Sequence, residues 1–84
     1  MAKTVLVVLV ADRTETAGKL QQVLSGWGCI VKTRLGIHDV NLEDCPKEGL
    51  LILELAGSKE QNEELARKIS VLPGISSKLV ELAL

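Results

Sequence analysis

Two short runs of aliphatic residues set the strongest limit on how this chain can fold. Residues 5–11 read VLVVLVA and are apolar throughout, and residues 50–56 read LLILELA, interrupted only by Glu54. Each run is too short for a typical helix and ends at polar or glycine residues. Continuous apolar runs of this length are typical of strands in the interior of a sheet. The sequence therefore predicts two central strands.

A helix signal follows the first run. Asp12 and Glu15 have the spacing of a capping box, and apolar residues then recur at helical spacing as far as Trp27. This pattern predicts a helix from Asp12 or Thr14 to about Ser25, with Trp27 packed in the core rather than used as a ligand platform.

A second helix signal follows the second run. Ser58 and Gln61 repeat the capping-box spacing, and Pro73-Gly74 mark the stop. The apolar stripe between them consists of Leu65, Ala66, Ile69 and Leu72.

Two further stretches predict edge strands. Residues 75–84 carry Lys78 and Glu81, as an exposed edge requires. Residues 29–36, CIVKTRLG, alternate in polarity. One face of this strand is then formed by Cys29, Val31, Thr33 and Leu35, and the other by Ile30, Lys32 and Arg34.

The resulting order of elements is β-α-β-β-α-β. In the ferredoxin-like split unit this order places the first and third strands at the centre of the sheet and the second and fourth at its edges. The continuous apolar runs fall on the first and third strands, so pattern and topology agree. The sequence predicts one α+β domain over residues 1–84: a ferredoxin-like βαββαβ sandwich, with a four-stranded antiparallel sheet and two helices on one face.

Helices on one face leave the other face of this sheet open. Alternate residues of both central runs point to that face, and they are almost all aliphatic. Apolar patches of this kind on small domains mark interfaces more often than solvated surfaces. We therefore expect a homo-oligomer, a dimer joined through the open sheet face.

Charge and hydropathy disfavour several classes of partner. Ten basic and eleven acidic residues give a net charge of -1 with no basic run, so direct nucleic-acid binding is not expected. Residues 5–11 lack a following small-x-small cleavage pattern, and no stretch approaches the roughly 20 apolar residues of a membrane span. We expect a cytoplasmic protein without membrane contact, its cysteines reduced.

The segment between the second and third strands is a candidate metal site. It contains His38 and Cys45, with Asp39 and Asp44 beside them. Imidazole, thiolate and carboxylate suit nickel, zinc or ferrous iron, and a two-fold axis would double the ligand set. His-x6-Cys is not a recognised ligand pair, so a solvated loop is the competing interpretation. Loops of this length are often functional or disordered.

The remaining polar residues give no catalytic signature. Lys32, Arg34 and Glu54 are expected to share a face, as cross-strand ion pairs or as a small anion site. Cys29 begins an edge strand and is expected to be an inert, small apolar residue. No nucleophile, base and acid combine, and no glycine loop cradles a phosphate, so we do not expect an enzyme.

Three segments together resemble a known family. They are DRTETAGKLQQVL at 12–24, TRLGI at 33–37 and LARKISVLPGISSKLVEL at 65–82. Over nearly its whole length the chain is similar to the iron-only hydrogenase system regulator family, whose small members have an ACT-like, ferredoxin-like fold. The resemblance implies a regulatory or accessory role in a hydrogenase system.

Two related folds bear on the ligand. ACT domains bind amino acids at subunit interfaces near an Asp-Arg-Pro-Gly turn, and here Thr14-Glu15 replace Pro-Gly. This replacement argues against an amino-acid ligand, because glycine allows close backbone approach. The C-terminal domain of nickel-responsive repressors is also distantly similar, but its several histidines are reduced here to His38. The resemblance implies an effector site at Asp12, Arg13, Arg34 and Gly36.

Two classes of function stay open. One is a small regulatory or sensory domain that binds an amino acid, a small anion or a metal at a subunit interface, so that affinity depends on assembly. The other is a protein–protein interaction or scaffold module without a ligand. No motif identifies a cofactor.

Overall fold

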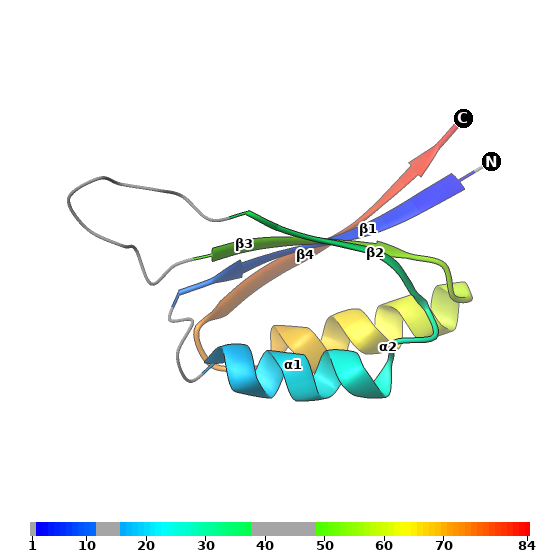
Figure 1. The fold of residues 1–84 in the computed structure, drawn as a ribbon. Helices are drawn as coiled ribbons and strands as arrows, with labels where there is room; N and C mark the ends of the chain where they lie inside the picture. The colour runs from blue at the N-terminus through cyan, green and yellow to red at the C-terminus, as the bar shows by residue number, and fades with distance from the viewer. Residues whose placement is uncertain (1, 12–15, 38–48) are drawn as a thin grey trace.

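A four-stranded antiparallel sheet with two helices on one face forms the fold (Figure 1). The computed structural model describes residues 2–11, 16–37 and 49–84. In this part of the chain, no helix is long and apolar enough to cross a membrane. The elements are β1 (Ala2–Val10), α1 (Thr16–Gly26), β2 (Val31–Ile37), β3 (Gly49–Leu55), α2 (Lys59–Ser70) and β4 (Ile75–Ala83).

The order of strands confirms the predicted topology. The sheet runs β2-β3-β1-β4, so the two apolar runs form its centre and the charged strands form its edges. β1 and β4 pair from Ala2–Ala83 to Val10–Ile75, whereas the ladder of β1 with β3 begins only at Thr4. The first two residues of β1 therefore extend past β3, beside both chain termini (Figure 1).

The core lies between the sheet and the helices. Alternate residues of β1 and β3 point toward the helices and are buried, because successive side chains of a strand face opposite sides. Burial of each large aliphatic side chain stabilises the fold by about 1.5–3 kcal/mol. Trp27 packs against this core, as predicted. The buried hydrophobic residues are Leu6, Val8, Val10, Leu20, Leu24, Leu51, Leu53, Leu55, Leu65 and Ile69.

A bulge in β2 changes the predicted orientation of this strand. Val31 pairs with Leu55 and Thr33 pairs with Glu54, with a register shift between them at Lys32. The extra residue reverses the alternation, as β-bulges do. The prediction that Val31 and Thr33 share a face was therefore wrong. β2 begins at Val31, so the prediction that Cys29 begins this strand was wrong. Cys29 precedes the strand and is exposed.

The start of α2 is fixed by side-chain hydrogen bonds. The backbone N–H of Gln61 donates to the Ser58 hydroxyl, and the backbone N–H of Ser58 donates to the side-chain oxygen of Gln61. These two bonds confirm the predicted capping box. Asn62 is buried, and its side chain accepts from the Gly57 N–H and donates to the Gly57 carbonyl. These bonds hold the turn from β3 to α2.

Gly57 has no room for a side chain, and Gly18 does. A methyl group on Gly57 would lie 2.9 Å from Ile30 Cγ2 and 3.0 Å from the Asn62 and Gln61 side-chain oxygens, whereas a methyl group on Gly18 meets nothing within 4 Å. We expect Gly57→Ala to lower the free energy of unfolding by about 1–3 kcal/mol. Gly18→Ala, in the interior of α1, should raise it by about 0.5–1 kcal/mol. Urea unfolding at one fixed protein concentration measures both, and equal effects would contradict the packing described here.

Candidate functional site

The open face of the sheet is aliphatic over most of its area. The strand register places on this face those residues of β1 and β3 that point away from the helices. Alternate residues of β2 and β4 lie on the same face. Both helices lie on the other side, so no described element covers it (Figure 1). Leu35 is 53% exposed, Leu9 49% and Leu82 61%. The apolar residues of this open face are Val5, Val7, Leu9, Leu35, Leu50, Ile52, Val80 and Leu82.

One carboxylate interrupts the aliphatic surface near the end where the termini lie. Glu54, on central strand β3, has Lys3 Nζ at 3.4 Å and Lys32 Nζ at 3.9 Å from its Oε2. The Thr33 hydroxyl lies 3.4 Å from Oε1 and donates to it. We call Lys3, Lys32, Thr33 and Glu54 the Glu54 cluster. It carries two positive charges and one negative charge.

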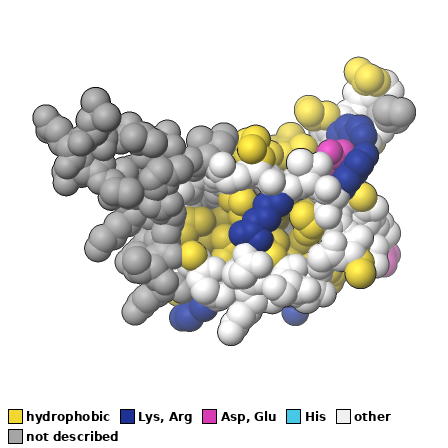
Figure 2. Space-filling model, in the orientation of Figure 1, with side chains coloured by type: hydrophobic (Ala, Val, Ile, Leu, Met, Phe, Trp, Pro, Cys, Tyr) yellow, Lys and Arg dark blue, Asp and Glu magenta, His cyan; other side chains and the backbone are white. Residues whose placement is uncertain are grey.

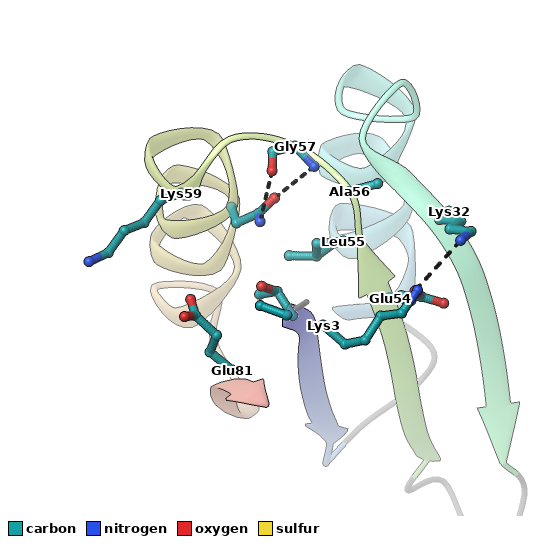
Figure 3. Close-up of a pocket in the computed structure, with 11 residues that line it drawn as sticks. Lys3, Lys32, Glu54, Leu55, Ala56, Gly57, Lys59 and Glu81 are labelled. Carbon is teal, nitrogen blue, oxygen red and sulfur yellow. Dashed lines mark hydrogen bonds and ion pairs between the residues drawn. The ribbon is translucent and has the colours of Figure 1, made fainter. Parts of the chain in front are cut away.

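The strand geometry explains why the two lysines meet at Glu54. Lys3 lies on the part of β1 that extends past β3, so its side chain reaches diagonally back to Glu54. Lys32 is the bulged residue of β2, and the bulge turns its side chain to the same carboxylate. Figure 3 shows Lys3 and Lys32 converging on Glu54 from the two flanking strands.

Two hollows border the Glu54 cluster. One lies on the open face, has a volume of about 390 Å³, and is lined by Lys3, Val5, Thr33, Leu35, Ile52 and Glu54. Its floor is aliphatic and its polar groups gather at one end. This combination is usual for small-molecule sites.

The other hollow lies at the end of the sheet. It has a volume of about 310 Å³ and extends from the Glu54 cluster to Gly57, Asn62 and Glu81. Lys59 also lines it, but its side chain points away from the cluster (Figure 3). Asn62 already accepts one hydrogen bond from Gly57 and donates one to it, so its side chain is held in the turn rather than aimed into this hollow.

Arg34 lies on the other side of the sheet from Glu54. It pairs with Leu53, which is buried against the helices, so its side of β2 is the helix side. There it lines a groove of about 210 Å³ with Leu24 and Val31. Figure 2 shows hydrophobic surface in the hollow between the sheet and α1, with a basic side chain across it. The prediction that Arg34 shares a face with Lys32 and Glu54 was wrong, because the bulge separates them.

The predicted effector residues are described only in part. Arg34 and Gly36 lie two residues apart on the helix side of β2, opposite Leu53 and Leu51. A methyl group on Gly36 would meet nothing within 4 Å, so packing does not require glycine there. Asp12 and Arg13 lie outside the described residues, and the site that joins them to Arg34 stays a prediction.

The predicted metal ligands, His38 and Cys45, also lie outside the described residues. Among residues 2–11, 16–37 and 49–84, no three His, Cys, Asp or Glu side chains lie close enough together to hold a metal ion. The metal hypothesis therefore stays untested.

Lys3 was not among the residues predicted for a site. The alternation of β1 could have identified it. One face of β1 carries Lys3, Val5, Val7 and Leu9, and Glu54 of the neighbouring strand lies on the same face of the sheet. An apolar run that begins at Val5 leaves Lys3 outside the predicted strand, whereas β1 begins at Ala2.

Comparison with solved structures shows the same fold in several proteins. An uncharacterized protein from Thermotoga maritima matches with a TM-score of 0.82 and 20% sequence identity, over 99% of this chain and 100% of that chain. The nitrogen regulatory PII-like protein CPII from Thiomonas intermedia, bound to ADP, AMP and bicarbonate, matches with a TM-score of 0.60 and 10% identity, over 100% of this chain and 93% of that chain.

A third similar structure is part of a larger enzyme. A formyltetrahydrofolate deformylase from Pseudomonas syringae pv. tomato matches with a TM-score of 0.62 and 15% identity, over 96% of this chain but 28% of that chain. No family model and no curated protein matches the sequence. At these identities the comparisons show the fold alone: this chain is a small ferredoxin-like domain.

The half-exposed ion pairs of the Glu54 cluster should contribute little to stability. Lys3 and Lys32 are 53% and 58% exposed in their side chains, and exposed ion pairs contribute about 0–1 kcal/mol. We expect Glu54→Gln to change the free energy of unfolding by less than about 1 kcal/mol. Leu53→Ala, one residue away on the buried side of β3, should lower it by about 2–5 kcal/mol. Urea unfolding compares the two variants, and a Glu54→Gln loss as large as that of Leu53→Ala would mean that the cluster is structural.

Proposed function

We propose that this chain is a small regulatory domain, not an enzyme, that acts as a homodimer joined through its open sheet face. In this proposal a small effector binds where the Glu54 cluster meets the dimer interface. The observation that carries it is the aliphatic surface that β1 and β3 form on the open face, which ends at the Glu54 cluster beside a hollow of about 390 Å³.

A second copy is the partner that fits the open face best. Strands of seven to nine residues, about 3.3 Å per residue and about 4.8 Å apart, give a four-stranded face of roughly 500 Å². Two such faces bury roughly 1,000 Å² or more, the lower limit for a specific interface. A two-fold axis places the same aliphatic surface on both sides, which makes it self-complementary.

Dimerisation would also complete the effector site. In one copy the hollow on the open face is open to solvent on the side away from the sheet. A second copy laid over Val5 and Ile52 closes that side, so ligand affinity and dimer affinity become coupled. The ligands of the PII-like protein support the idea that a fold of this class accommodates small effectors.

We propose that the system under regulation is an iron-only hydrogenase system. The resemblance of residues 12–24, 33–37 and 65–82 to iron-only hydrogenase system regulators supports regulation of such a system in the cytoplasm. It rests on those sequence motifs alone. The alternative function is that of a ligand-free scaffold. Such a scaffold would form the same dimer but would bind no effector.

Val7→Glu tests the interface directly. Val7 lies at the centre of the open face, opposite Ile52 on β3 and Lys78 on β4, so a glutamate there can pair with Lys78 in the single chain. In a dimer the same carboxylate would be buried against the aliphatic face of the second copy, which does not replace the hydration that the charge loses. We expect the parent protein to sediment as a dimer at micromolar concentration and Val7→Glu to sediment as a monomer with unchanged far-ultraviolet circular dichroism.

Val71→Glu is the matched control. Val71 is 74% exposed at the end of α2, outside the open face, and should remain dimeric after the same chemical change. A monomeric parent protein at this concentration, or equal dissociation of both variants, would contradict the proposed interface.

A ligand screen then separates the effector-binding domain from the scaffold. Binding to the native state alone raises the melting temperature. We expect at least one member of a panel of small anions, amino acids and divalent metals to raise the melting temperature of the parent protein. A flat response from a stable dimer would favour the scaffold.

A further inference from the structure

Within the described part of the chain, the Glu54 cluster sets two lysines against one carboxylate. Lys3 and Lys32 approach the same oxygen of a single carboxylate, so the three groups sum to one positive charge. Among the described residues, no other acidic side chain lines the hollow on the open face. In an exposed cluster water solvates the surplus charge at little cost, but a surface that covers the hollow would remove part of that water.

The rest of the hollow is suited to hydrocarbon. Val5, Leu35 and Ile52 form its floor next to the charged end. A ligand that complements both parts carries one negative charge at one end and a short aliphatic chain at the other. A dianion would exceed the surplus charge and would repel Glu54.

We infer that the hollow on the open face binds a short aliphatic monocarboxylate, with its carboxylate at Lys3 and its chain on Val5, Leu35 and Ile52. This inference rests on the proposed function, because it assigns the effector of the proposed dimer. The ligand neutralises the cluster, and its chain adds aliphatic surface to the face that a second copy covers. Binding therefore strengthens dimerisation, and dimerisation strengthens binding by the same factor.

Sedimentation equilibrium in sodium butyrate, sodium acetate and sodium chloride of equal ionic strength tests the inference. We expect butyrate to lower the dimer dissociation constant roughly tenfold relative to chloride, within the usual range for such coupling. Acetate should act more weakly, because its single methyl group covers less of the floor. Butylammonium chloride, which has a similar chain and the opposite charge, should not strengthen the dimer.

Lys3→Gln identifies the groups responsible. It leaves a neutral pair of Lys32 and Glu54, so the dimer should form at least as tightly in chloride as the parent dimer does, and its response to butyrate should disappear. Lys19→Gln makes the same change in net charge on the exposed surface of α1 and should keep the full response.

The outcomes separate the two proposals. A parent dimer with the same dissociation constant in butyrate and chloride, or a Lys3→Gln variant that keeps the full response, would overturn the monocarboxylate site and leave the dimer standing. A parent protein that stays monomeric in every salt would overturn the proposed dimer and this inference together.

Discussion

The structure depends on the placement of two aliphatic strands at the centre of one sheet. Because side chains alternate, each strand supplies one set to the helices and a second set to the opposite face. Leu6, Val8 and Leu53 are fully buried under the helices, and hydrophobic burial of this set stabilises a small domain with a single tryptophan and no other aromatic residue. The second set is also mostly aliphatic, and the described elements leave it open. The proposed dimer and the proposed effector site both depend on that second set.

Glu54 makes one end of the open face chemically different from the other. A carboxylate on a central strand would weaken the sheet if it stood alone among aliphatic neighbours, and two features of the backbone prevent this. The extension of β1 past β3 brings Lys3 to it from one side, and the bulge of β2 brings Lys32 from the other. The Glu54 cluster is thus confined to one end of the open face, and Lys78 of edge strand β4 is a further charged residue of this face. A surface with an aliphatic centre and one polar end can bind both a second copy and a small polar ligand.

The sequence predicted the fold well and the site only in part. The two continuous apolar runs, the Ser58–Gln61 capping box and the stop at Pro73-Gly74 are local signals, and each agrees with the structure. Arg34 shows where local signals fail. Alternation along CIVKTRLG places it beside Lys32, but one extra residue in the ladder sends the two side chains to opposite faces. A bulge depends on how two strands pair, and no residue of β2 alone specifies that pairing.

By itself, therefore, the sequence determined the number, type and order of the elements and which strands lie in the centre, because these follow from the periodicity of side chains within single segments. Only the tertiary structure decided that Lys3 and Lys32 meet at Glu54 and that Arg34 faces the helices. Those positions depend on strand register and on a bulge, which are set by pairing between strands that come from separate segments of the chain.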